Sequence, residues 1–152
     1  MGPVSGIQLR LSDFVGQNRR MLNTPQKIRV LRIIARMNVG GPAVQVAGIS
    51  KTIDQNIFEH LLVTGYCEKD EIDYLESREL SFPVVRIEGL GRSLNLKSDF
   101  RAFLQIRSLI KSFRPDIIHT HTAKAGFLGR LASLSVKDDA IRIHTFHGHL
   151  LS

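Results

Sequence analysis

Short apolar runs alternate with helical segments along most of this chain, and no other feature constrains its fold as strongly. The first run, IRVLRIIA over residues 28–35, is rich in β-branched residues and is interrupted only by two arginines. A run of this kind is typical of a strand that is covered on both faces of a sheet. Similar runs predict further strands over 58–64, 83–87, 117–120 and 141–146.

Helical segments are expected between these strands. A helix over about 42–53 should follow the first strand, because a glycine pair permits a sharp turn and proline suits the first helical position. Its buried face is expected to comprise Val44, Ala47 and Ile53. A polar stretch around 70–79 fits a short surface helix.

The longest expected helix begins at a Ser98 cap and stops before Pro115. Its apolar residues recur at helical spacing, at Phe100, Phe103, Leu104, Ile110 and Phe113. A last helix over 123–134 carries its apolar residues at Leu128, Leu131 and Ala132. The alternation of strand and helix predicts an α/β fold, with a Rossmann-like parallel sheet, helices on both faces and right-handed crossovers.

Composition limits the domain count and the environment. With 152 residues and 43% hydrophobic content, the chain can form one ordinary core. Residues 1–26 show weak periodicity and are expected to be a flexible extension before a domain over 27–152. Neither a secretory signal nor an apolar run of membrane-spanning length is present, which predicts a cytoplasmic location. A formal charge of +7 favours phosphates, anionic lipid or nucleic acid without choosing among them.

Polar residues gather where the predicted strands end. In an open parallel sheet, ligands bind outside the carboxyl ends of the strands, where the strand order reverses. The residues expected there follow the first, fourth and fifth strands, and they are Asn38, Gly40, Gly41, His121, Thr122, Lys124, His147, Gly148 and His149. Of these, His147 should project into the crevice, because it lies where the strand gives way to a glycine loop.

The pair Gly40-Gly41 has two interpretations of about equal weight. Backbone N–H groups at the start of a helix can meet a phosphate or a sugar hydroxyl, because no Cβ blocks the approach. A purely structural turn explains the same pair. A dinucleotide site is disfavoured, because the three-glycine fingerprint and an acidic residue at the end of the second strand are both missing. Lys124 could neutralise an anionic group or simply be solvated on the first turn of its helix.

Five histidines lie at the ends of the fourth and fifth strands. Period-two spacing places His119 and His121 on one face of the sheet. Metal-dependent hydrolases use such pairs but also recruit carboxylates, and the strand ends supply none, so no metal ligands are assigned. His119 and His144 are interpreted as partly buried residues satisfied by backbone hydrogen bonds.

Three strings resemble those of glycosyltransferase family 4. They are LGRS over 90–93, followed by Asp99, then RPDIIHTHTAKAGFLGRLA over 114–132 and HTFHGH over 144–149. The resemblance is to the amino-terminal domain of bacterial members, which build cell-surface polysaccharides and glycolipids on a GT-B fold of two facing Rossmann-like halves. It implies retaining transfer from a nucleotide-diphosphate sugar, which is a substrate, and no tightly bound cofactor or metal.

The resemblance also implies roles for individual residues. Asn38, Gly40 and Gly41 match the glycine-rich loop that faces the donor diphosphate and the acceptor. His147 matches the histidine that contacts the transferred sugar and can assist the chemistry at its anomeric carbon. Arg92, Thr122 and Lys124 match loops that generally bind the acceptor. His121 and Gly148, placed at the strand ends, complete the expected set of donor- and acceptor-binding residues.

In the family, a carboxyl-terminal half holds the nucleotide, and the chain as given has no such half. The amino-terminal domain itself is expected to be incomplete at its carboxyl-terminal end. The expected partners are therefore the missing half, in the same or another polypeptide, and an anionic membrane surface at the inner face of the membrane, but not nucleic acid. The chain alone is expected to be inactive.

Two alternatives remain. The chain could be a stand-alone binding or assembly module, or an inactive remnant. A metal-dependent hydrolase built on the histidine cluster is a lower alternative. The donor sugar, nucleotide, acceptor, linkage and oligomeric state do not follow from the sequence.

Overall fold

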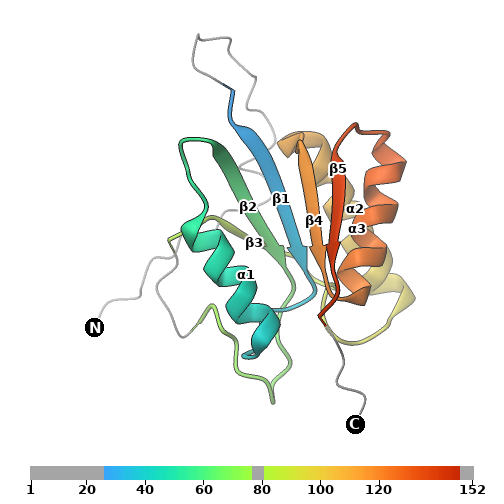
Figure 1. The fold of residues 1–152 in the computed structure, drawn as a ribbon. Helices are drawn as coiled ribbons and strands as arrows, with labels where there is room; N and C mark the ends of the chain where they lie inside the picture. Colours follow the sequence, from blue (N-terminus) through green and yellow to red (C-terminus); the bar gives the residue numbers. More distant parts are fainter. Residues whose placement is uncertain (1–25, 77–80, 148–152) are drawn as a thin grey trace.

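The five strands form one all-parallel sheet in a computed structural model that describes residues 26–76 and 81–147 (Figure 1). The strands are β1 (Ile28–Ile34), β2 (Phe58–Thr64), β3 (Val84–Arg86), β4 (Ile117–His121) and β5 (Ile141–Thr145). Their order in the sheet is β3-β2-β1-β4-β5. The predicted α/β fold is confirmed, and each predicted strand lies within two residues of its observed bounds. Residues 1–25, which make up nearly all of the expected extension, lie outside the described residues.

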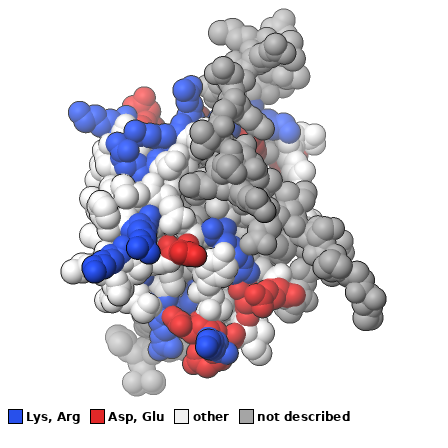
Figure 2. All heavy atoms as spheres, turned by 180° about the vertical axis from the view of Figure 1, so that it is seen from behind, with Lys and Arg blue, Asp and Glu red and all other residues white. Residues whose placement is uncertain are grey.

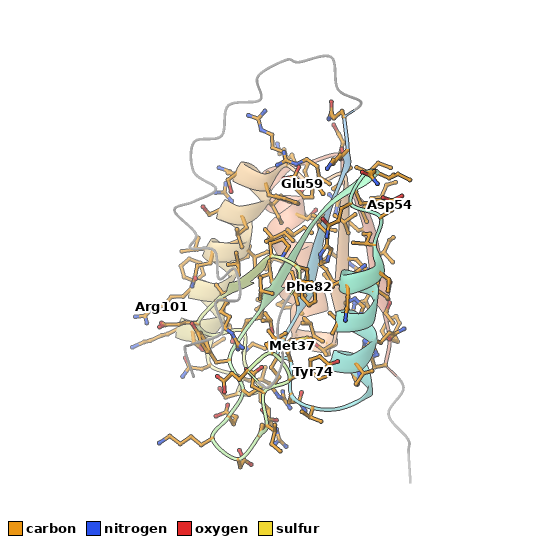
Figure 3. The ribbon with its side chains drawn as sticks, turned by 90° about the vertical axis from the view of Figure 1, so that its left-hand side faces the viewer. Met37, Asp54, Glu59, Tyr74, Phe82 and Arg101 are labelled. Carbon is orange, nitrogen blue, oxygen red and sulfur yellow. The ribbon has the colours of Figure 1, made fainter. Side chains whose placement is uncertain are left out.

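Helices cover both faces of the sheet, as predicted. The helix α1 (Gly41–Thr52) packs on one face, and α2 (Leu96–Phe113) and α3 (Ala123–Val136) pack on the other (Figure 1). The core on the α1 side includes Met37, Leu62 and Phe82, and Figure 3 shows Phe82 between the sheet and α1. The larger core on the other side is formed mainly by residues of β1, β2, α2 and α3.

The buried faces of the helices differ from the predicted ones. In α1 the buried residues are Ala43, Val46, Ala47 and Ser50, whereas Val44 is exposed and Ile53 lies beyond the last helical residue. In α2, Phe100 and Leu104 are exposed, and in α3 Leu131 is exposed. In α1 and α3 small residues make much of the contact with the sheet, so choosing the largest apolar side chains rotates the predicted face away from the true one.

The predicted cap of α2 was also wrong. Asn95 caps this helix, with its side-chain oxygen accepting from the N–H groups of Lys97 and Ser98. Ser98 instead donates its hydroxyl to the carbonyl of Asn95. Asparagine is as good an N-cap as serine, so the two candidates are not separable by residue type alone.

The helix α3 approaches the sheet closely through two glycines. A Cβ added at Gly126 would lie 2.6 Å from the ring of His144, and one at Gly129 would lie 2.8 Å from a methyl carbon of Thr120. Both distances are shorter than side-chain carbons tolerate. The glycines within the string at 114–132 therefore permit the packing of α3 on β4 and β5.

The expected surface helix around 70–79 is not formed over 70–76, and residues 77–80 lie outside the described residues. Residues 72–74 run antiparallel to the loop that follows β1, with a bridge between Asn38 and Asp73. The N–H of Tyr74 donates to the carbonyl of Met37 at 2.7 Å, and both residues lie at the same end of the molecule in Figure 3. The N–H of Val39 in this loop donates in turn to the carbonyl of Ile72 at 2.9 Å, so backbone groups of the segment are paired with the loop rather than within a helix.

Candidate functional site

The carboxyl ends of the strands lie together at the lower edge of the sheet in Figure 1. The strand β1 has β2 on one side and β4 on the other. The chain leaves β1 for α1 on one face and leaves β4 for α3 on the opposite face, so the two connections diverge. This is the arrangement in which parallel sheets bind ligands. We call the residues that follow β1, β4 and β5 at this end (35–41, 121–124 and 145–147) the carboxyl edge.

No feature of the fold explains the glycine pair at the carboxyl edge. Gly40 has a φ of 164°, an extended conformation that any residue can adopt. A Cβ added at Gly41 would meet nothing within 4 Å, and one at Gly40 would make only ordinary contacts at 3.9 Å. By contrast, a Cβ at Gly65 would lie 2.7 Å from the carbonyl oxygen of Ala35. The described structure would therefore accommodate side chains at both positions of the pair.

The amino-terminal end of α1 is open to an anion. Gly40 provides no side-chain cap, and the first turn contains no acidic residue. The N–H groups of a first helical turn have no intrahelical acceptor, and the helix dipole adds a partial positive charge there. Backbone N–H groups can thus bind phosphate oxygens or sugar hydroxyls at this point.

The loop before α1 is held by an ion pair that sequence reasoning missed. Asn38 bridges to Asp73, and a carboxylate oxygen of Asp73 lies 2.6 Å from Nη1 of Arg86 in β3. Both side chains are nearly fully buried, at 6% and 9% exposure. The pairing joins residues thirteen positions apart, on a loop and a strand, and no short motif indicates it. The ion pair holds Asp73 in place, and the bridge to Asp73 in turn fixes the position of Asn38.

Thr122 joins the ends of β4 and β1. Its Oγ1 accepts a hydrogen bond of 3.3 Å from the N–H of Ala35. Its φ of 70° lies in the left-handed region, which a β-branched residue rarely adopts and which costs about 1–3 kcal/mol. The surrounding structure holds this conformation at the point where the chain turns from β4 into α3. Strain of this kind is typical of ligand-binding sites.

Lys124 is not simply solvated. Its ammonium lies 2.6 Å from a carboxylate oxygen of Asp99 in α2 and donates to the carbonyl of Ser93 at 2.6 Å. The loop that contains Arg92 is thereby tied to the start of α3. Arg92 itself is exposed.

Three histidines form a stack on the α1 side of the sheet. Nδ1 of His121 lies 3.0 Å from Nε2 of His147. The ring centroids of His119 and His121 are 4.2 Å apart, which confirms that they share a face. Nε2 of His119 lies 2.8 Å from the hydroxyl oxygen of Thr145. The structure thus brings together two predicted site residues, His121 and His147, from different strands.

The protein holds His121 and His119 in their neutral forms. Burial lowers the pKa of His121 to about 3, with further lowering by His119 and Arg32. Burial, followed by Arg32, lowers the pKa of His119 to about 4. Arg32 is buried on the same face and donates to Ser50 of α1 at 3.3 Å. Because Arg32 lies within an otherwise apolar strand segment, sequence reasoning did not predict that its charge would act on the histidines.

His144 lies on the opposite face of the sheet from the stack. Its Nδ1 is 2.8 Å from the hydroxyl oxygen of Thr120. The expectation of backbone hydrogen bonds is corrected for His119, whose ring contacts the hydroxyl of Thr145; His144 has both the hydroxyl and the backbone of Thr120 as partners. Gly148 and His149, which were assigned to the same region, lie outside the described residues.

The histidine cluster does not form a recognisable metal site. Within 26–76 and 81–147, no group of three or more His, Cys, Asp and Glu side chains is placed so that it could hold a metal ion. The histidines of the stack instead contact one another and Thr145.

A comparison with protein families decides the affiliation of the chain. A family model described as Glycosyltransferase Family 4 matches residues 39–151, which is more than half of the chain. The chain belongs to glycosyltransferase family 4. The resemblance inferred from the strings at 90–93, 114–132 and 144–149 is thereby confirmed.

A curated relative supports the placement in glycosyltransferase family 4. The chain is 34% identical over 76 residues to an Escherichia coli protein named UDP-Gal:alpha-D-GlcNAc-diphosphoundecaprenol alpha-1,3-galactosyltransferase. The alignment covers 50% of this chain and 19% of that relative.

Solved structures share the fold of this family 4 domain. A Listeria monocytogenes protein described as a UDP-N-acetylglucosamine 2-epimerase matches 80% of the chain, with 32% of its own length, a TM-score of 0.62 and 19% identity. MurG from Acinetobacter baumannii matches 77% of the chain, with 35% of its own length, a TM-score of 0.53 and 16% identity. At these identities the likeness concerns the fold alone. The chain spans about a third of the length of these proteins.

The described helices also bear on membrane insertion. None of the helices over 26–76 and 81–147 combines the length and the apolar character needed to cross a bilayer.

Proposed function

We propose that this chain is the acceptor-binding half of a retaining glycosyltransferase. The donor is a nucleotide-diphosphate sugar, and the acceptor is a precursor of a cell-surface polysaccharide or glycolipid. The observation that carries the proposal is the carboxyl edge, where an open glycine pair, an uncapped helix end and His147 follow strands β1 and β5 of one sheet. The name of the galactosyltransferase relative supports this donor class and a lipid-linked acceptor.

The glycine pair supports contact with a ligand. Neither glycine is required by the described fold, whereas both leave space in front of the first turn of α1. The bound diphosphate or an acceptor hydroxyl would accept hydrogen bonds from these N–H groups. Asn38, held by Asp73, and Thr122, tied to Ala35, extend the same wall.

His147 is the proposed catalytic residue. Its ring is only partly buried, and one nitrogen is engaged by His121, which leaves the other for the transferred sugar. A positioned histidine can donate a hydrogen bond to the sugar and stabilise charge as the bond to the diphosphate breaks. Arg92 lies in the loop before α2, and Lys124 is tied to this loop by its hydrogen bond to the carbonyl of Ser93. Both residues would line the acceptor side.

The second wall of the cleft is proposed to come from a further domain, in the same or another polypeptide. The relatives are roughly three to five times longer than the matched part, since the chain covers 19% to 35% of them. A groove of about 390 Å³ lies between α3 and β5 and is lined by Phe127 and Phe146, which are 69% and 86% exposed. These exposed aromatic side chains also support packing of a further part of the protein against this face. One wall alone would leave the reacting centre in water.

Contact with an anionic membrane surface is a further part of the proposal, supported by the charge of +7. On the face seen in Figure 2, lysines and arginines are interspersed with acidic residues over the described part. Flotation with vesicles that contain an anionic lipid tests this contact. The chain is expected to float with these vesicles and to be released as the salt concentration rises. If salt-sensitive flotation occurs with neither anionic nor neutral vesicles, the proposed membrane contact is contradicted.

A transfer assay tests the proposed reaction. The chain is incubated with UDP-galactose and a GlcNAc-diphosphate-polyprenol acceptor, alone and together with the separately produced carboxyl-terminal part of the galactosyltransferase relative. Transfer is expected only in the second case, with the α configuration of the donor retained. Substituting His147→Ala should lower the rate by about a hundredfold or more, while His144→Ala serves as the matched control. Robust transfer by the chain alone, or an inverted product, would contradict the proposal.

A further inference from the structure

The buried histidine His121 has a partner on one side only. It is 0% exposed, its Nδ1 faces Nε2 of His147 at 3.0 Å, and its Nε2 has no hydrogen-bond partner among the described residues. Burying a ring nitrogen without a hydrogen-bond partner costs free energy, so the orientation of His121 calls for an explanation. The rings of His121 and His147 are nearly parallel, with an interplanar angle of 28°.

We propose that His121 is a positioning residue that fixes the tautomer of His147, so that Nδ1 of His147 carries the proton and is the atom offered to a ligand. In this arrangement Nδ1–H of His121 donates to Nε2 of His147. The assignment to a sugar ligand rests on the proposed function, but the tautomer itself does not.

Charge around His121 selects the direction of this hydrogen bond. Arg32 is buried on the neighbouring strand β1, in register with His119, and it is the cation that acts on His121; the other groups that lower the pKa of His121 are histidines. In an electropositive environment, a lone pair at the unpartnered Nε2 is favoured over an N–H group at that atom. A neutral His121 with its lone pair at Nε2 must carry its proton at Nδ1. That proton then points to Nε2 of His147.

The consequence for His147 follows from its two nitrogens. When Nε2 accepts a hydrogen bond, the neutral ring carries its proton on Nδ1. Nδ1 of His147 has no hydrogen-bond partner among the described residues, and the His147 side chain is only partly buried. His119 supports the stack from the other side, with its own Nε2 at Thr145.

Nuclear magnetic resonance of the whole chain with ¹⁵N-labelled histidine tests this inference without any activity measurement. The spectrum near pH 7 is expected to show His147 as a single Nδ1–H tautomer, with its signals assigned by their loss in His147→Ala. In His121→Leu the single tautomer should be lost, and the signal of Nε2 should move toward that of a protonated nitrogen. In the control His144→Leu, on the other face of the sheet, the His147 signals should not move.

Two results would overturn the inference. One is an Nε2–H tautomer of His147 in the unsubstituted chain, a measurement that does not depend on how the variants fold. The other is a His147 spectrum that stays the same in a folded His121→Leu variant. Because the ligand-free chain is measured, a failure here is distinct from a failure of the proposed transfer reaction.

Discussion

At the scale of single residues, Gly41 and Gly48 offer a matched comparison. Both lie in α1 with nothing within 4 Å of an added Cβ, but only Gly41 lies at the helix end that faces the carboxyl edge. Each Gly→Ala change should raise the free energy of unfolding by about 0.4–1 kcal/mol, because alanine restricts the unfolded chain.

The two substitutions should differ in ligand binding. With the carboxyl-terminal part used in the transfer assay present, Gly41→Ala is expected to weaken binding of UDP-galactose at least tenfold, about 1.4 kcal/mol, because the methyl group occupies the approach to the first helical turn. Gly48→Ala should leave the affinity unchanged. Calorimetric titration and chemical denaturation of both variants measure the two effects. Equal affinities for the two variants would show that Gly41 does not contact the sugar nucleotide.

The buried histidines predict a pH dependence of stability. Burial lowers the pKa of His60 and of His121 to about 3, with Arg32 contributing in both cases. The unfolded chain binds protons at these residues below its ordinary pKa of about 6.5, whereas the folded chain does not. Stability is therefore complete above about pH 6.5 and falls as the pH decreases toward 3.

Chemical denaturation between pH 7 and pH 4 measures this effect. Each such histidine should contribute at most about 1.4 kcal/mol per pH unit to the slope. In His121→Leu the slope should decrease, since one titrating group is gone. A slope that is the same in this variant would show that His121 does not titrate differently in the folded and unfolded chain.

Sequence reasoning identified the candidate residues at this scale because strand ends in a parallel sheet share one edge. His121 and His147 follow from that rule, and the structure joins them. The strain at Thr122 and the buried charge of Arg32 depend on contacts between distant segments. No local pattern carries that information.

At the scale of elements, the connection between β2 and β3 supports the loop before α1. The buried pair of Asp73 and Arg86 joins this connection to the end of the sheet. Removing one member of a buried pair leaves the other charge without compensation.

Substituting Arg86→Met is therefore expected to lower the free energy of unfolding by about 3 kcal/mol. The control Arg29→Met removes an ion pair with Glu59, a residue that is 47% exposed, and should cost less. Equilibrium denaturation of both variants measures the difference. A cost for Arg86→Met no larger than that for Arg29→Met would contradict a supporting role for the pair.

The elements themselves were largely predictable. Runs of β-branched residues placed all five strands, since such runs suit a sheet buried on both faces. The segment around 70–76 was misjudged, because its backbone groups exchange hydrogen bonds with the loop after β1 rather than within a helix. The helix faces were misjudged where alanine, serine and glycine make the contact instead of larger residues.

At the scale of the whole molecule, the chain presents one sheet with its candidate residues at one edge. The fold class followed from the alternation of strands and helices, whereas the family followed from specific strings in the sequence. The epimerase and MurG share this fold, although their names differ. The function must therefore be tested at the carboxyl edge itself.

Mapping the binding of UDP-galactose onto the chain tests the central claim most directly. Amide resonances of the ¹⁵N-labelled chain are followed as the sugar nucleotide is added in the presence of the unlabelled carboxyl-terminal part used in the transfer assay, with UDP alone and inorganic diphosphate as comparisons. The account predicts that the largest shifts occur at Gly40, Gly41 and His147, with little change at Gly48 or at the opposite ends of the strands around Asp116. Shifts confined to that opposite end, or to the groove between α3 and β5, would contradict it.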